Sequence, residues 1–479
     1  MSEVPQTDAQ DAPEHVESHD LPVPDAYSAF MRTGWGEREL DVAPHPITEW
    51  ARARRERLVE QFPGERLVIP AGGFKVRAND TDYRFRAETA HTYLCGNQTS
   101  HAALVVEDGE VVLYARPRSS RDTDEFFRDR EYGELWVGRR PSLSEISDSL
   151  GVETRHVDEL EDRLSGTSSR GTKTRVLRGV DPRVDALVTG DGARDEELAR
   201  VLSELRLVKD SWELGELQHA CDITTLGFED SVREWDKVLE HGERWLEGTF
   251  FRRARTMGND LGYDSIVGGG RHATTLHWVE NSGPVTPGDL ILLDMGAEAT
   301  SLYTADVTRT LPVSGTYTPL QRELYSLVLE AQQAGIDAVR PGAGFRDPHH
   351  AAMSVLAHAL DDMGLLPVSA EEALSPDSRV YMRWTLHGTS HMLGLDVHDC
   401  AAADPGAYAD GVLEEGMVLT VEPGLYFQED DLLVPEELRG IGIRIEDDVV
   451  VTADGAHNLS AALPRDPDEV ESWMASLKA

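Results

Sequence analysis

The sequence predicts a mixed α/β (α+β) protein in which two folded domains follow an acidic tail. Its 479 residues exceed the usual size of one domain. An apolar content of 40% and a charged content of 28% are typical of a globular protein. Runs that predict strands and runs that predict helices occur on both sides of a junction near Leu207. The expected parts are a tail over residues 1–30, an N-terminal α/β domain over 31–207 and a C-terminal domain over 208–479.

The composition also limits the classes of partner and the compartment. A formal net charge of −41 argues against binding to nucleic acid or to an anionic membrane surface. No apolar run has the length of a membrane-spanning helix, and the N-terminus lacks the basic and apolar regions of a signal peptide. Three separated cysteines, Cys95, Cys221 and Cys400, form neither a zinc pattern nor a disulfide framework. We therefore expect a cytoplasmic protein.

The first part of the chain predicts secondary structure but no catalytic site. Residues 1–30 carry seven acidic residues and four prolines but no Lys or Arg, so we expect them to be disordered. Residues 150–179 are rich in Arg, Ser, Thr and Gly and predict loops. The regular segments that we expect are a helix over 47–61, a strand over 66–70, a hairpin of 102–106 with 111–114, and a helix over 196–207.

The second part begins with a helix start and then becomes rich in strands. Asp210 with Glu213 resembles a capping box, and Asp347 is expected to be the N-cap of a later helix. The histidines of that later helix are interpreted as surface or core residues without a ligand role: His349, His350 and His358. The expected helices cover 243–257 and 320–339, and the expected strands cover 264–270, 275–278, 290–293 and 306–311.

Four carboxylates lie on these strands or at their ends. Asp294 follows the apolar run 290–293, and Asp306 begins the next strand twelve residues later. Taken alone, these two aspartates fit N-cap or turn positions better than a shared site. Two glutamates join them, because Glu422 and Glu446 each end a strand with an apolar, alternating pattern. A carboxylate at such a position requires a cation, and four of them suggest shared cations.

One imidazole completes the set. Residues 387–399 read HGTSHMLGLDVHD, and their glycines favour a loop that points imidazoles, among them His391, into a cavity. Four carboxylates brought together would repel one another, whereas two divalent cations would balance their charge. Carboxylates with a single imidazole suit Mn²⁺ better than structural zinc, which favours thiolates. Paired metal ions activate water, so hydrolysis is the expected chemistry.

The order and wording of these motifs resemble the pita-bread metallopeptidases. The motifs LHWVEN, HGTSHMLGLDVHD, LTVEPGLY and GIGIRIEDD are similar to those of the Xaa-Pro aminopeptidase (aminopeptidase P) and prolidase branch. The stretch DYRFR…YLCG and the junction RLVKDSWEL resemble the N-terminal domain and linker of aminopeptidase P. The resemblance covers about residues 47–451. It implies that residues 31–207 are an aminopeptidase P-type domain and residues 208–479 a catalytic pita-bread domain.

The resemblance assigns metal ligands. It implies that Asp306 and Glu446 bridge two divalent ions, that Asp294 holds one of them, and that His391 and Glu422 hold the other. Glu422 also matches the proton shuttle of the family, which takes a proton from the water bridging the two metals, leaves a bridging hydroxide there, and passes the proton to the leaving nitrogen.

The resemblance also assigns residues around the reacting bond. His398 matches the histidine that polarises the scissile carbonyl. His277 and His387 match histidines on the leaving-group side of the pocket. Arg444 matches an arginine beside the last glutamate, which we interpret as orienting the carboxylates and as a candidate for contacting substrate.

One departure from the family pattern concerns the two aspartates. They are usually eleven residues apart in the family and are twelve apart here. We expect a bulge or a longer turn within residues 299–304, with the ligands kept in place.

The implied function is that of a metal-dependent aminopeptidase. Its partner would be a peptide with proline in the second position, from which it releases the N-terminal residue, and a homo-oligomer, dimer or tetramer, is expected. The main alternative is prolidase, which cleaves only dipeptides. Methionine aminopeptidase has the same ligands but lacks the large N-terminal domain, and a degenerate peptide-binding module would have lost ligands.

One segment favours the aminopeptidase over prolidase. Dipeptidases of this family supply an arginine for the substrate carboxylate from the segment after the VHD motif. Here that segment, residues 400–413, has two aspartates and no Lys or Arg. A buried carboxylate without a partner is costly, so we expect peptides of three or more residues to be preferred.

Overall fold

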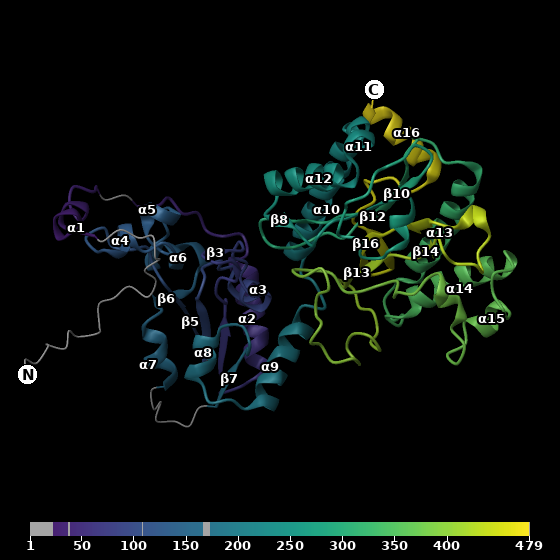
Figure 1. Cartoon of the computed structure of the whole chain (residues 1–479). Coiled ribbons are helices and arrows are strands. Elements are labelled where there is room, and N and C mark those ends of the chain that lie inside the picture. Colours follow the sequence, from purple (N-terminus) through teal and green to yellow (C-terminus); the bar gives the residue numbers. More distant parts are fainter. Residues whose placement is uncertain (1–22, 37–38, 108, 166–172, 479) are drawn as a thin grey trace, which may run out of the picture. The chain divides into compact units, whose positions relative to one another are not determined.

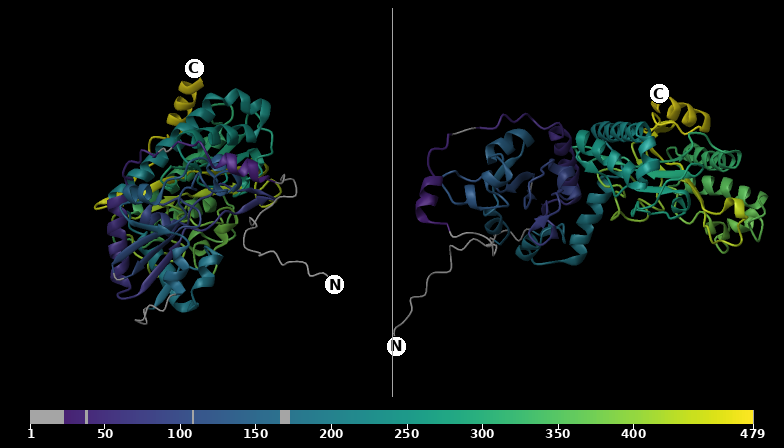
Figure 2. Two further views of the ribbon diagram at one scale, coloured as in Figure 1. Left: turned by 90° about the vertical axis from the view of Figure 1, so that its left-hand side faces the viewer. Right: turned by 45° about the horizontal axis from the view of Figure 1, so that its top comes forward.

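The computed structural model describes residues 23–36, 39–107, 109–165 and 173–478, which belong to two compact units (Figure 1 and Figure 2). The first unit is Met1–Asp195 and the second is Glu196–Ala479. The division falls within helix α9 (Gly192–Leu205). This helix confirms the one predicted for residues 196–207. The domain limits of 31–207 and 208–479 stay a prediction.

The first unit is built on a five-stranded mixed sheet in the order β6-β5-β4-β1-β7. β1 (Arg66–Pro70) is buried along its whole length, between antiparallel β4 and parallel β7. Its apolar Leu-Val-Ile run explains this place, because a strand covered on both faces needs apolar side chains on both. The predicted strand and hairpin are confirmed. The other strands are β2 (Val76–Ala78), β3 (Thr81–Asp82), β4 (Ala103–Glu107), β5 (Glu110–Ala115), β6 (Glu153–His156) and β7 (Thr174–Val176).

Short helices surround this sheet. The helix expected at 47–61 is confirmed as α2, in which the side chains of Arg54 and Arg55 donate to the carbonyls of Tyr93 and Leu94. The helices are α1 (Asp25–Met31), α2 (Thr48–Gln61), α3 (Thr89–Cys95), α4 (Glu125–Arg128), α5 (Glu134–Val137), α6 (Leu143–Leu150), α7 (Glu159–Ser165) and α8 (Pro182–Leu187).

Two predictions for this unit need correction. The loops predicted for residues 150–179 are wrong, because β6, α7 and β7 lie there. β6 and β7 are the two edges of the sheet, and β6 reads Glu-Thr-Arg-His, so its sequence lacks the apolar pattern of a strand. Residues 1–22 of the predicted disordered tail lie outside the described residues. The rest of the predicted tail is described and contains most of helix α1, so the prediction is wrong there.

The second unit contains several small antiparallel sheets. Two of them have three strands, in the orders β12-β10-β9 and β13-β16-β17, and the others are the pairs β14-β15 and β11-β8. The strands are β8 (Asp260–Leu261), β9 (Ile266–Gly269), β10 (Leu290–Asp294), β11 (Ala297–Glu298), β12 (Thr308–Pro312), β13 (Val418–Val421), β14 (Gly424–Phe427), β15 (Ile441–Arg444), β16 (Asp447–Thr452) and β17 (Gly455–Asn458).

Long helices cover these strands, which lie in the middle of the unit with α10 and α12 on one side and α13 and α14 on the other (Figure 1). Phe250 of α12, Leu324 of α13 and Ile291 of β10 are all buried in one core. No helix among the described residues is long and apolar enough to cross a bilayer. The helices are α10 (Ser211–Arg233), α11 (Trp235–His241), α12 (Glu243–Met257), α13 (Pro319–Ala338), α14 (Asp347–Asp362), α15 (Ala370–Ala373) and α16 (Pro467–Lys478), with 3₁₀ turns η1 (Gly270–Thr274), η2 (Val380–Arg383) and η3 (Glu436–Leu438).

The starts of two helices test the capping predictions. Asp210 and Glu213 form the predicted capping box of α10, because each side chain accepts from the backbone N–H of the other. At α14, however, the N-cap is Arg346 and Asp347 is the first helical residue. The Asp347 carboxylate accepts from the Gly344 N–H instead of capping the helix.

The hairpin of β10 and β12 contains the longer turn that the spacing of its aspartates predicts. Asp294 pairs with Thr308, and the antiparallel register continues to a bridge between Glu298 and Thr304. The Leu302 N–H donates to the carbonyl of Ala299, and Leu302 has a φ of 71°. This is a three-residue hairpin loop with a left-handed last residue. The strands therefore keep their register, and the extra residue lies in the turn.

The strand predicted for residues 275–278 is wrong. Those residues follow η1 and have no ladder partner among the described strands. The backbone hydrogen bonds of this segment are local: the Thr275 N–H donates to the carbonyl of His272, and the Val279 N–H donates to that of His277. The apolar pattern that suggested a strand comes from Leu276 and Trp278, which are partly buried and pack against a small core that includes Leu292 and Tyr426.

Candidate metal centre

The second unit brings the predicted carboxylates together because its strands end at one place. Asp294 is the last residue of β10, and Asp306 precedes β12 on the antiparallel partner strand. Glu422 follows β13, and Glu446 lies between β15 and β16. The Glu446 N–H donates to the carbonyl of Thr308, which joins the two halves of the unit at the site.

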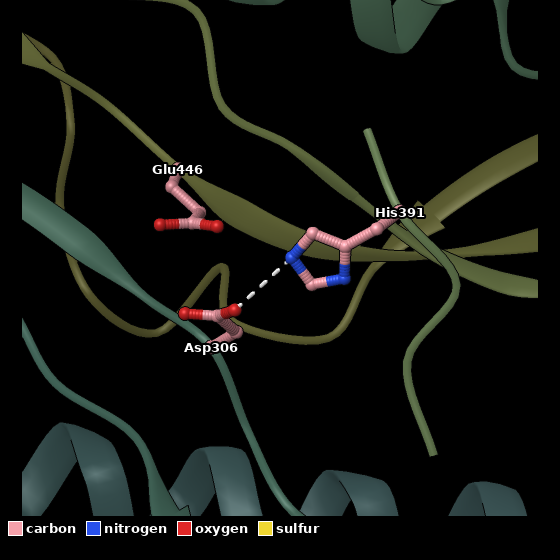
Figure 3. A group of neighbouring side chains, drawn as sticks. All are labelled: Asp306, His391 and Glu446. Atoms are coloured by element: carbon pink, nitrogen blue, oxygen red, sulfur yellow. Dashed lines mark ion pairs between the residues drawn. The ribbon is translucent and has the colours of Figure 1, made fainter. Parts of the chain in front are cut away.

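Three of the predicted ligands form a compact cluster. Ligand atoms of Asp306, His391 and Glu446 all lie within 4.8 Å of one another. Figure 3 shows the two carboxylates on the same side of the imidazole, from which Nε2 points towards Asp306 at 3.3 Å. The same Nε2 atom lies 3.6 Å from Oε1 of Glu422. These residues present oxygen and nitrogen atoms to one common point.

Asp294 is held by two donors beside this cluster. The Tyr263 hydroxyl donates to Oδ1 at 2.6 Å, and the Arg444 guanidinium donates to Oδ2 at 2.5 Å. Arg444 also donates to the hydroxyls of Tyr426 at 3.0 Å and Thr308 at 3.1 Å. All three nitrogens of the buried guanidinium are therefore used within the protein. This supports the interpretation that Arg444 orients the carboxylates.

The protonation of these groups shows an excess of negative charge. Burial, together with the charges of Asp306, Glu422 and Asp294, raises the pKa of Glu446 well above its ordinary value. Burial also raises the pKa of Asp294, and it raises that of Glu422 to about 7. Burial lowers the pKa of His391, but its hydrogen bond to Asp306 and the charge of Glu422 outweigh this effect and raise the value to about 9. Carboxyl groups whose pKa values are raised by one another's charge fit a site for divalent cations.

Three further histidines surround the cluster. The rings of His391 and His398 meet edge to face, with centroids 4.3 Å apart. His387 places Nε2 2.8 Å from the Tyr426 hydroxyl and Nδ1 3.5 Å from Oε2 of Glu422. Burial lowers the pKa of His387 to about 4 and also lowers that of His398, and the nearby charge of His277 contributes to both shifts. His277 itself is exposed. All the predicted site residues thus lie in one region.

A second layer of residues fixes the ligands and was not predicted from the sequence. Thr308 donates to Oε2 of Glu446 at 2.5 Å. The carboxylate of Asp448 accepts from the Asp306 N–H at 3.0 Å and from the Cys221 thiol at 3.2 Å. Thr308 could have been predicted from the sequence, because it lies two residues after Asp306 and therefore on the same face of the strand. Tyr263 could not, since it belongs to a loop far away in sequence.

The donor set indicates what the site can hold. Its atoms are carboxylate oxygens and one imidazole nitrogen, and the described residues place no cysteine thiol among them. Hard oxygen donors with a single imidazole fit a catalytic divalent-cation site better than a structural zinc site, which is usually rich in thiolates. Such ions lower the pKa of water and polarise carbonyl groups, so the arrangement is suited to hydrolysis.

Comparisons with known proteins agree with the fold and the site. Residues 215–453 match metallopeptidase family M24, and residues 51–176 match the N-terminal domain of aminopeptidase P. The fold and the site define a metal-dependent peptidase, and the chain belongs to metallopeptidase family M24. Both domains and their order are those of aminopeptidase P, which confirms the resemblance noted in the sequence.

Named relatives match almost the whole chain. Xaa-Pro aminopeptidase 2 of Streptomyces coelicolor is 55% identical over 454 residues, which are 94% of this chain and 96% of that one. Xaa-Pro aminopeptidase of Escherichia coli is 32% identical over 447 residues, or 89% and 97% of the two chains. The structure of E. coli aminopeptidase P with the inhibitor Pro-Leu has a TM-score of 0.79 at 30% identity and covers 91% of this chain and 99% of its own. The structure of Pseudomonas aeruginosa aminopeptidase PepP has a TM-score of 0.80 at 30% identity and covers 91% of this chain and 99% of its own.

Proposed function

We propose that this chain is a metal-dependent Xaa-Pro aminopeptidase, which releases the N-terminal residue from peptides with proline in the second position. The observation that carries the proposal is the cluster of Asp306, His391 and Glu446 in a chain of family M24. Relatives that match both domains are named Xaa-Pro aminopeptidases, which favours this activity over that of prolidase.

The metal ligands are proposed to be Asp294, Asp306, His391, Glu422 and Glu446, with Asp306 and Glu446 shared between two ions. Two divalent ions, for which we propose Mn²⁺, would supply an activated water and polarise the scissile carbonyl. The oxygen-rich donor set supports Mn²⁺, although an E. coli aminopeptidase P structure described as zinc-substituted shows that a related site accepts Zn²⁺. Reconstitution of metal-free protein should give two ions per chain and the highest kcat/KM with Mn²⁺. One ion per chain in the active protein would contradict it.

The chain's own residues are proposed to handle the proton and the carbonyl. Oε2 of Glu422 lies 3.5 Å from Nδ1 of His387, a residue proposed for the leaving-group side. Glu422 is therefore placed to take a proton from the activated water and pass it to the leaving nitrogen. His398, beside His391, is proposed to donate to the carbonyl oxygen as negative charge develops there. His277 and His387 are proposed to line the leaving-group side. Proline is selectable there because its nitrogen carries no N–H and its ring has a fixed shape.

The surroundings of Arg444 support cleavage of peptides longer than dipeptides. A dipeptide would place its carboxylate beside the proline, where it needs a cation. Arg444 is buried and already donates to Asp294, Tyr426 and Thr308. In the segment 400–413, Asp410 pairs with Arg346 at 2.8 Å, so that guanidinium is also engaged.

The test of this preference compares Ala-Pro with Ala-Pro-Ala at equal metal concentration. We expect kcat/KM to be higher for the tripeptide by roughly tenfold or more, the cost of an unpaired charge in a pocket. A dipeptide advantage of that size would overturn the aminopeptidase assignment and leave prolidase.

Two further properties complete the proposal. We propose that the protein is cytoplasmic and forms a homo-oligomer, either a dimer or a tetramer. The first follows from three separated cysteines that form no disulfide pattern, and the second from the resemblance to oligomeric relatives. Light scattering coupled to size exclusion should give two or four times the chain mass of 52.9 kDa. The mass of a single chain would contradict it.

A further inference from the structure

A fully buried carboxylate lies behind the segment that carries His277. Glu243 is the first residue of α12 and has a relative exposure of 0%. A carboxylate removed from water in this way is costly unless hydrogen bonds compensate it. None of the roles proposed above uses Glu243, although it is one of the most buried ionisable side chains of the unit.

The Glu243 carboxylate joins both ends and the interior of one segment. Oε1 accepts from the Gly269 N–H at 2.8 Å and lies 2.7 Å from Nδ1 of His272. Oε2 accepts from the Gly283 N–H at 2.6 Å and from the Trp278 indole at 2.9 Å. Each oxygen therefore has two partners. Residues 269–283 form a loop whose two ends meet on one side chain.

The packing around this carboxylate leaves little freedom. The rings of His272 and Trp278 stack with centroids 4.0 Å apart and an angle of 26°. A Cβ added at Gly283 would lie 2.4 Å from the His272 ring and 2.8 Å from Oε1 of Glu243. Only glycine permits the approach of the backbone to the carboxylate at this point. The loop is thus built around Glu243 and does not merely pass near it.

His277 depends on this loop for its position. It directly precedes Trp278, its side chain is exposed, and no hydrogen bond of its imidazole to any described residue is seen. The segment 275–278 has no strand partner that could hold it. The bonds of Glu243 to Trp278, His272 and the loop ends therefore supply the order that a strand ladder would otherwise give.

We propose that Glu243 is a positioning residue that fixes the loop 269–283 and thereby presents His277 to the leaving-group side of the site. The inference rests on the proposed function, because it takes His277 as a group that contacts the substrate. A loop ordered before binding avoids loss of conformational entropy when the substrate arrives. Glu243 acts through His277 and does not touch the reacting atoms.

The first experiment replaces Glu243 by glutamine in the full-length, metal-loaded enzyme. The amide keeps the shape but replaces one acceptor oxygen by a donor, which then faces two donors. We expect kcat/KM for Ala-Pro-Ala to fall by roughly tenfold or more, as misplacement of a catalytic group does, with unchanged metal content. The matched control is Glu247→Gln, one turn further along α12 and partly exposed, which should keep wild-type activity.

A double-mutant cycle separates positioning from a general structural role. If Glu243 acts through His277, then Glu243→Gln should lower kcat/KM by less than about twofold in a His277→Ala background. Fully additive losses would overturn the inference. If the wild-type protein itself does not cleave Ala-Pro-Ala, the proposed function is contradicted instead.

Hydrogen exchange tests the inference without an activity measurement. Glu243→Gln should accelerate amide exchange within residues 270–282 while leaving the rest of α12 unchanged. If that variant fails to fold, Trp278→Phe removes one of the four hydrogen-bonding partners of Glu243 but keeps an aromatic ring beside His272, and it should accelerate exchange in the same segment. Unchanged exchange in the folded variant would overturn the inference.

Discussion

At the scale of residues, the site is an arrangement of charges that neutralise one another only in part. Asp294 accepts hydrogen bonds from Arg444 and Tyr263. The carboxylates of Asp306, Glu446 and Glu422, in contrast, all lie near one imidazole, that of His391. The sequence predicted these residues as ligands, from carboxylates at the ends of apolar strands and from the resemblance of the surrounding motifs. It did not reveal Tyr263, whose contact with Asp294 arises only when the chain folds.

The proposed bridging residues make the sharpest prediction at this scale. Asp306→Asn and Glu446→Gln each remove one charge that both ions would share, so each should abolish activity. The fold should survive because the strands remain. Turnover should be measured together with metal content by mass spectrometry. A variant that keeps about a tenth of wild-type turnover with full metal content would show that the residue does not bridge.

At the scale of elements, the loop that carries His398 is tied to the chain just after α9. Asp399 is buried and accepts from the Arg206 guanidinium at 3.0 Å. Burial raises the pKa of Asp399, but the charges of Arg206 and Lys209 outweigh it, so the pKa lies below its ordinary value. A carboxyl with a lowered folded-state pKa stabilises the fold above its unfolded-state pKa, and this stability is lost as the pH falls through the folded value.

Breaking this pair should therefore destabilise the second unit. Asp399→Asn removes a buried negative charge that Arg206 and Lys209 face, which costs about 3–5 kcal/mol of unfolding free energy. The measurement is denaturant unfolding at neutral pH. The matched control is Asp410→Asn, which breaks the exposed pair with Arg346 and should cost about 1 kcal/mol or less. Equal effects of the two substitutions would refute the anchoring role of Asp399.

The elements also show why part of the fold could not be predicted from the sequence. Helices α2 and α12 and strand β10 follow from local patterns, and the structure confirms them. Strand β6 does not, because a polar edge strand is defined by its partner β5 and not by its own residues. The segment 275–278 misled for the opposite reason, since its half-buried Trp278 donates to the carboxylate of Glu243 and the segment pairs with no described strand.

At the scale of the whole molecule, the acidic site couples stability to metal and to pH. The pKa of Glu422 rises from 4.5 to about 7 in the folded chain, and that of His391 rises from 6.5 to about 9. The metal-free folded chain therefore binds more protons than the unfolded chain within these windows. Its stability should fall as the pH rises through them. Divalent ions replace those protons and remove the loss.

Thermal unfolding with and without a chelator measures this coupling. We expect the Tm difference between the metal-loaded and metal-free protein to be larger at about pH 8 than at about pH 5. The difference is used because other groups titrate equally in both samples. A Tm difference that does not change with pH would contradict the proposed ligand roles of Glu422 and His391.

The turn between β10 and β12 has a consequence for how related chains can vary in length. An insertion within either strand would reverse the faces of all following residues and carry Asp306 out of the site. The extra residue here lies at 300–302, where the only adjustment is the left-handed backbone of Leu302, with a φ of 71°. A change of length at this tip therefore leaves both aspartates in place, and we expect length differences between the two ligands of related chains to occur there.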